Sequence, residues 1–92
     1  ENKHQGAQFR AARAMANLSM RQLHELAQVD RNFTTRLERG KFALINVETV
    51  RELERFFQSI EIDLVPETDE FGAGVRWMVT EPRLLTRSLK KQ

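Results

Sequence analysis

The chain of 92 residues contains no cysteine. Without thiols, neither a disulfide framework nor a thiolate zinc site can form. No apolar run approaches the roughly 20 residues that a membrane-spanning helix needs, so no membrane partner is expected. The first eight residues are polar or small, which is not the pattern of a secretory signal peptide. Together these absences favour a protein of the reducing cytoplasm.

Motifs for catalysis and for cofactor binding are also missing. His24-Glu25 is not the start of a zinc-binding H-E-x-x-H motif, because Gln28 stands where the second His is needed. The run Gly72-Ala73-Gly74 lacks the third glycine of a dinucleotide fingerprint. No paired carboxylates lie in an apolar setting, so acid–base catalysis has no candidate. The sequence therefore predicts a protein that is not an enzyme and that holds no metal and no cofactor.

The charges that are present are unevenly distributed, although the net charge is only +2. Residues 1–41 hold eight Lys/Arg and four Asp/Glu, residues 42–74 hold two and eight, and residues 75–92 hold five and one. A basic first part suits a polyanionic partner, and the acidic middle argues against a protein that coats nucleic acid on every side. An ordinary solvated surface explains the charges equally well.

Two short helices are predicted in the first 27 residues. Apolar positions in Gln8–Ala16 recur with helical spacing and no Gly or Pro interrupts them. Ser19 and Gln22 form a capping box, in which the Ser oxygen accepts a bond from the third helical amide and Gln reaches back. The apolar face of the second helix consists of Leu23, Leu26 and Ala27.

A third helix follows after a short break at Gln28-Val29. Asp30 is its expected N-cap, because a carboxylate accepts bonds from free amides and complements the helix dipole. The helix is predicted over Arg31–Arg39 and ends at Gly40, which adopts the left-handed C-terminal conformation most easily. A loop is expected over Lys41–Ile45.

The rest of the chain predicts one more helix and then a β-hairpin. Asn46 caps a helix of roughly 12 residues, with an apolar stripe at Val47, Val50, Leu53 and Phe57. After it the period changes from 3.6 to 2, which is typical of half-buried strands. The alternating apolar positions are Ile60, Ile62 and Leu64 in the first strand, and Val75, Trp77 and Val79 in the second.

Two short helices with a tight break between them, the second rich in Arg and Asn, are the arrangement of a DNA-reading helix-turn-helix. Phe33 and Leu37 are expected to face the core. The side chains then left outward are Arg31, Asn32, Thr35 and Arg36. Arg can donate two bonds to guanine, and Asn can pair bidentately with adenine. A solvated helix face with no ligand is the alternative interpretation.

The residues FRAARAMANLSMRQLHELAQVDRNFTTRLERG, positions 9–40, resemble the xenobiotic-response-element (XRE), or Cro-like, family of helix-turn-helix regulators. The shared pattern is R-x-x-R, then L-S-x-x-x-L, then V-S/D followed by L-E-x-G. The later helix and hairpin, which ends in G-V-R-W, are similar to a short bacterial subgroup of this family. The resemblance implies a mainly α fold, a four-helix repressor-like DNA-binding domain followed by a C-terminal β-hairpin.

The resemblance also implies roles for individual residues. Arg13 and Glu38 would form a structural ion pair between the first and third helices, which is physically reasonable near apolar faces. The base contacts would be Arg31, Asn32 and Arg36. The phosphate contacts would be Ser19, Arg21, Thr35, Arg39 and Lys41, with the free amides of the second helix contributing.

Four positions depart from the family pattern. Met20 replaces a phosphate-binding Gln, and His24 replaces a small Ala at the helix contact. Gln28 replaces the Gly of the turn, so a non-Gly residue has to accept positive φ there. Thr34 replaces an aliphatic residue in the core.

These expectations define a domain organisation and two functional hypotheses. Residues 1–58 form the DNA-binding domain, residues 59–80 the hairpin, and residues 81–92 a basic tail that is a short helix or disordered. The first hypothesis is a homodimeric transcriptional regulator, a repressor on a palindromic operator of double-stranded DNA. Its dimerisation residues would be Ile60, Ile62, Leu64, Val75, Trp77 and Val79. The second is an antitoxin-like or adaptor protein whose tail, with Leu84, Leu85 and Leu89, binds a toxin or another protein.

Overall fold

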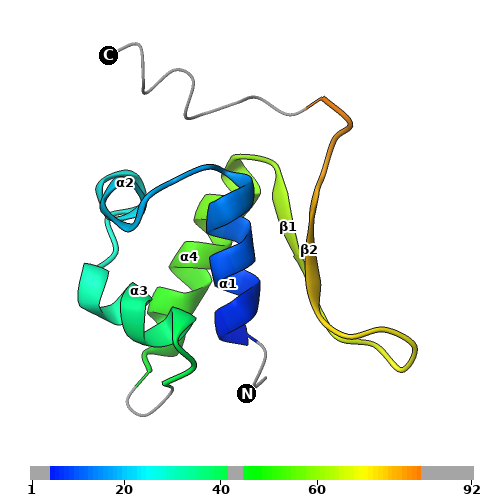
Figure 1. The fold of residues 1–92 in the computed structure, drawn as a ribbon, viewed down its shortest axis with the longest axis horizontal. Coiled ribbons are helices and arrows are strands. Elements are labelled where there is room, and N and C mark those ends of the chain that lie inside the picture. The colour runs from blue at the N-terminus through cyan, green and yellow to red at the C-terminus, as the bar shows by residue number, and fades with distance from the viewer. Residues whose placement is uncertain (1–4, 42–44, 82–92) are drawn as a thin grey trace.

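The computed structural model describes residues 5–41 and 45–81, which form four helices followed by a two-stranded antiparallel hairpin (Figure 1). The elements are α1 (Gln5–Met15), α2 (Met20–Ala27), α3 (Arg31–Glu38), α4 (Val47–Ser59), β1 (Ile62–Val65) and β2 (Gly74–Trp77). The expectation of a mainly α fold with a C-terminal hairpin is confirmed. The tail residues Leu84, Leu85 and Leu89 lie outside the described residues.

Side-chain caps define where three of the helices begin. Ser19 Oγ accepts a bond from the Gln22 amide at 3.0 Å, and Gln22 Oε1 accepts one from the Ser19 amide at 2.9 Å. The Asp30 carboxylate accepts a bond from the Phe33 amide at 2.9 Å. Asn46 caps α4 in the same way. These three starts are the ones that the sequence predicts, because each cap bonds to an amide only two or three residues away.

Left-handed backbone conformations close the turns after α2 and α3. Gln28 has φ 58° and Gly40 has φ 75°. Gly40 adopts this conformation without steric strain. At Gln28 the Cβ atom makes the same conformation less favourable. The predicted positive φ at Gln28 is confirmed.

A single core joins the four helices and the hairpin. Its largest fully buried apolar side chains come from α1, α2, α3, α4 and β1 in turn: Phe9, Leu23, Leu37, Leu53, Phe57 and Ile62. The rings of Phe9 and Phe57 lie 6.2 Å apart, and those of Phe56 and Phe57 meet edge to face at 5.3 Å. Aromatic pairs at these separations add to the burial energy. The core therefore lies between α1 and α4, and the other elements close it.

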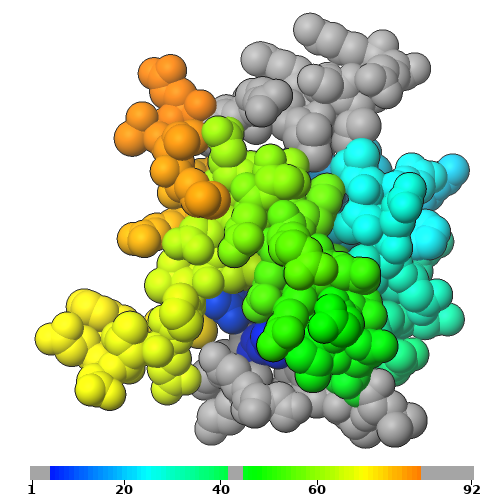
Figure 2. Space-filling model, turned by 180° about the vertical axis from the view of Figure 1, so that it is seen from behind, coloured from blue at the N-terminus to red at the C-terminus, as the bar shows by residue number. Residues whose placement is uncertain are grey.

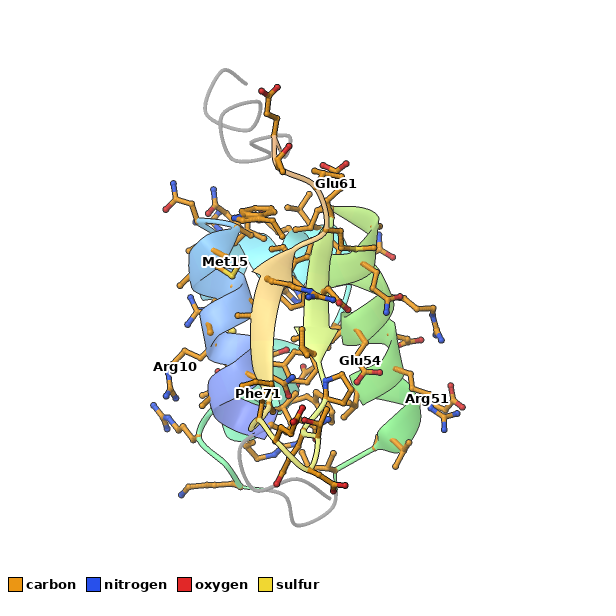
Figure 3. All side chains as sticks on the ribbon, turned by 90° about the vertical axis from the view of Figure 1, so that its right-hand side faces the viewer. Arg10, Met15, Arg51, Glu54, Glu61 and Phe71 are labelled. Atoms are coloured by element: carbon orange, nitrogen blue, oxygen red, sulfur yellow. The ribbon has the colours of Figure 1, made fainter. Side chains whose placement is uncertain are left out.

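The hairpin packs over α1 and α4 with one face (Figure 3). Its register pairs Ile62 with Trp77 and Leu64 with Val75, and these four side chains pack toward the core. Asp63 and Arg76, paired on the opposite face, form an ion pair of 3.5 Å. The alternation predicted for the two strands thus separates an apolar inner face from a polar outer face.

Gln8 ties α1 to the loop end of the hairpin. Its Nε2 donates to the carbonyl oxygens of Val65 and Gly74, at 2.8 and 2.9 Å. Because Val65 and Gly74 are themselves cross-strand partners, one amide group holds both strands. The hairpin is therefore fixed to α1 by hydrogen bonds as well as by packing.

Several element ends differ from the prediction. α1 begins three residues before Gln8, and Arg39 is the C-cap of α3 rather than its last residue. Ile60 is the C-cap of α4 and Val79 follows the end of β2, so neither belongs to a strand. Val47, predicted on the buried stripe of α4, is 62% exposed because it stands in the first turn, beyond the edge of the core.

Within residues 5–41 and 45–81, no helix has the length and the apolar character needed to cross a membrane.

Candidate nucleic-acid interface

α2 and α3 lie on one side of α1, and the hairpin lies on the other (Figure 1). Gln28, Val29 and Asp30 alone separate the two helices, and Val29 is buried against the core. On α3, Phe33 and Leu37 point inward, as the helical period predicts. The outward positions Arg31, Asn32 and Arg36 are all exposed. The three residues predicted to contact bases therefore share one solvent-facing side of α3.

An ion pair joins this helix to α1. Arg13 Nε donates to Glu38 Oε2 at 2.8 Å and Arg13 Nη2 donates to Glu38 Oε1 at 2.9 Å. The contact is bidentate, which makes it strong and orients both groups. Glu38 is only 5% exposed and the Arg13 side chain is 23% exposed. The predicted partners do meet, and α3 is held at its C-terminal end.

The charge on Arg13 is secured by this geometry. The hydrogen bond to Glu38 raises the pKa of the Arg13 guanidinium, burial opposes the rise, and the attraction of the Glu38 charge adds to it. A raised pKa keeps the arginine charged at every pH below it, so deprotonation of Arg13 requires strong alkali. Arg13 Nη1 also donates to the carbonyl of Leu18, at 3.1 Å, which anchors the start of α2 to the same side chain.

Two further contacts of α1 support α3, and no sequence pattern indicates either of them. Arg10 Nη1 donates to the backbone carbonyl of Glu38 at 3.0 Å. At Gly6, a Cβ atom would stand 2.4 Å from the carbonyl oxygen of Leu37, so only glycine fits. These are contacts between segments about 30 residues apart, and only the fold brings them together. They fix where the exposed side of α3 points.

The predicted phosphate contacts differ in how exposed they are. Ser19, Arg21, Arg39 and Lys41 are exposed, while Thr35 is half-buried. The Ser19 hydroxyl is already occupied as the helix cap, which leaves backbone amides of the first turn of α2 for an anion. Arg21 lies 3.4 Å from Glu25 in an exposed pair, and such pairs exchange readily for another anion.

The carboxylates of this region are all engaged with groups of the chain. Glu25 meets Arg21, Asp30 caps α3, and Glu38 binds Arg13. Among residues 5–41 and 45–81, no carboxylate forms a salt bridge with the four exposed cations Arg31, Arg36, Arg39 and Lys41. The surface of α3 and its C-terminal turn is therefore positively charged and suited to a polyanion.

The positions that depart from the repressor pattern are accommodated locally. The exposed His24 ring lies with Nδ1 2.9 Å from the carbonyl of Val29, so it lines the turn rather than separating the helices. Thr34 is buried, and its hydroxyl donates to the Asp30 carbonyl at 3.2 Å. The turn keeps its left-handed residue at Gln28. The substitutions leave the exposed side of α3 intact.

The structure corrects part of the predicted dimerisation surface. Ile62 is fully buried in the chain's own core, so it has no surface to offer a partner. Leu64, Val75 and Trp77 are half-buried against that core and keep only part of their surface. Ile60 and Val79 lie outside the strands. The inner face of the hairpin thus packs against the chain's own core, where it covers the apolar side chains between α1 and α4.

No protein-family model, curated protein or solved structure matches this chain. The resemblance of residues 9–40 to the Cro-like regulators rests on the motif spacing alone.

Proposed function

We propose that the protein is a sequence-specific regulator that binds double-stranded DNA through α2 and α3, in the manner of a helix-turn-helix. One observation carries the proposal: Arg31, Asn32 and Arg36 share the exposed side of a helix whose other side is locked into the core. The bidentate tie of Arg13 to Glu38 and the close approach at Gly6 hold α3 against α1. Both features fix the direction in which α3 projects.

The proposed contacts follow from groove geometry. The major groove admits an α-helix, and base edges there present a distinct pattern for each base pair. Arg31 and Arg36 would read guanine through two hydrogen bonds, and Asn32 would read adenine. Arg21, Arg39 and Lys41 would contact phosphates, as would Thr35 and the first-turn amides of α2. Phosphate contacts set register and affinity, and base contacts set sequence.

One recognition helix covers half of a typical specific site, so we propose a homodimer on a palindromic operator. Two-fold dimers of this class place their recognition helices about 34 Å apart, one turn of DNA. Occlusion of a promoter by such a dimer represses transcription. We propose that the protein acts in the cytoplasm. The lack of cysteine is compatible with that reducing compartment.

Selection of bound sequences from random duplex DNA, followed by mobility-shift titration, tests the proposal. Arg31→Ala and Arg36→Ala are each expected to weaken binding by about 1–3 kcal/mol and to relax the preference at one base position. Arg51→Ala is the matched control, because Arg51 is an exposed arginine on α4 that projects from another side of the molecule (Figure 3). The control is expected to bind like the parent.

The phosphate contacts have a different signature. Lys41→Ala is expected to weaken binding to every duplex alike and to reduce the dependence of log K on log salt by about one. If Arg31→Ala and Arg36→Ala bind the selected duplex as tightly as Arg51→Ala does, α3 is not the reading helix.

A further inference from the structure

An apolar groove runs between α1 and the loop end of β2. It has a volume of about 380 Å³ and is lined by Ala7, Gln8 and Ala11 from α1 and by residues 72–75 from the hairpin. The amide nitrogen of Gln8 is already bonded to the carbonyls of Val65 and Gly74. The groove is therefore lined by small apolar side chains, and the Gln8 amide nitrogen already donates to two carbonyls of the hairpin. Such a lining suits an apolar occupant.

Beside this groove the hairpin loop presents an exposed aromatic side chain. Phe71 is 73% exposed, the most exposed of the large apolar residues in the described part of the chain. The loop stands out from the body of the molecule (Figure 2), and Phe71 lies beside the lower end of β2 in Figure 3. An aromatic ring of this size left in water is a candidate anchor for an interface.

The turn that carries Phe71 is held by hydrogen bonds. The Thr68 hydroxyl accepts from the amides of Glu70 and Phe71, at 3.2 and 3.0 Å, and the Thr68 amide donates to the Phe71 carbonyl at 2.8 Å. A turn bonded in this way presents its side chain in a defined position. Burial of the ring by a partner therefore costs side-chain freedom but little ordering of the backbone.

We infer that the occupant of the groove is Phe71 of a second copy of this chain, exchanged reciprocally across a two-fold axis. The inference deepens the proposed function, from which it takes the homodimer. Gly72 follows Phe71 in the chain and lines the groove, so the projecting ring and the groove belong to one patch. A patch that carries both parts is self-complementary, and a self-complementary patch closes as a two-fold dimer instead of extending into a filament.

Charges around the patch favour the same pairing. Asp69 and Glu70 directly precede Phe71 and are exposed, and no acidic residue occupies the first turn of α1. Arg10 is an exposed cation of α1 beside the groove wall; one nitrogen of its guanidinium donates to the Glu38 carbonyl, and the side chain lies at the height of the loop end of the hairpin (Figure 3). When Phe71 enters the groove of the partner, its acidic neighbours approach the basic, N-terminal part of the partner's α1.

The size of the patch predicts a weak dimer. Two exchanged phenylalanines bury about 150–250 Å² each, whereas a standard stable interface buries about 800 Å² on each partner. The surroundings of the groove add area but no second large anchor. We therefore expect a monomer–dimer equilibrium that depends on concentration and that DNA with two half-sites shifts toward the dimer.

Analytical ultracentrifugation of the full chain without DNA, over a concentration series, tests the inference. The parent chain is expected to rise from 10.8 kDa toward twice that mass. Phe71→Ala removes the anchor, and Ala11→Leu fills the groove while leaving Phe71 in place. Each is expected to weaken association about tenfold or more. The double variant should be no weaker than the single ones, because both changes remove the same contact.

Val47→Ala is the control, since Val47 is an exposed apolar residue on α4, which contributes no residue to the groove. It should associate like the parent. A parent chain that stays at 10.8 kDa at every concentration overturns the inference, as does a Phe71→Ala variant that dimerises normally. Binding of the monomer to a single half-site is measured separately, so loss of the dimer does not count against base reading by α3.

Discussion

Arg13→Met breaks the tie between α1 and α3 while keeping most of the packing of the arginine stem. The structure predicts a large loss, because the abandoned Glu38 carboxylate is only 5% exposed. Removing one partner of a buried pair typically costs about 3–5 kcal/mol. We therefore expect a loss of about 3 kcal/mol in the free energy of unfolding.

Urea and thermal unfolding followed by circular dichroism measure this loss. In a domain of this size about 3 kcal/mol lowers Tm by about 12–24 °C. The control is Arg21→Met, which breaks the exposed pair with Glu25 and should change stability by less than about 1 kcal/mol.

The double variant Arg13→Met/Glu38→Met separates pairing from packing. Replacing both charges by apolar groups of similar size is often neutral, so the double variant should lie within about 1 kcal/mol of the parent. A double variant that loses as much as the two single variants together would refute the reasoning, because the two side chains would then be independent.

Two further predictions concern the backbone. Gly6→Ala places a Cβ 2.4 Å from the carbonyl of Leu37 and must push α1 and α3 apart, so unfolding in urea should show a loss of about 1–3 kcal/mol. An unchanged midpoint would mean that the two helices are less closely fixed than described. Gln28→Gly relieves a left-handed conformation at φ 58° and should raise stability by about 0.5–1 kcal/mol, measured as an increase in Tm. A lower Tm would contradict that account.

Local signals predicted much of the first three helices. The caps at Ser19 and Asp30 and the left-handed Gly40 depend on neighbours within a few residues, so the sequence displays them directly. The exposed side of α3 followed from the helical period once Phe33 and Leu37 were placed inside. This part of the candidate site needed no knowledge of the fold.

The remaining features depend on tertiary contacts. Ile60 alternates with Ile62 as a strand residue would, yet α4 continues to Ser59 and Ile60 caps it. The bonds of Gln8 to the hairpin join residues 57 and 66 positions apart, so no window along the sequence contains both partners. The burial of Ile62 within its own chain could not be predicted either. An alternating strand pattern shows that one face is apolar, but not whether the same chain or a partner packs against it.

One helix of eleven residues, α1, contacts both of the surfaces for which a function is proposed. It meets α3 through Gly6, Arg10 and Arg13, and it meets the hairpin through Gln8. No flexible linker therefore lies between the surface proposed to join two copies and the surface proposed to read bases. In a dimer built this way the spacing of the half-sites is a property of the protein's rigid shape, and an operator with altered spacing would have to bend or twist to be bound.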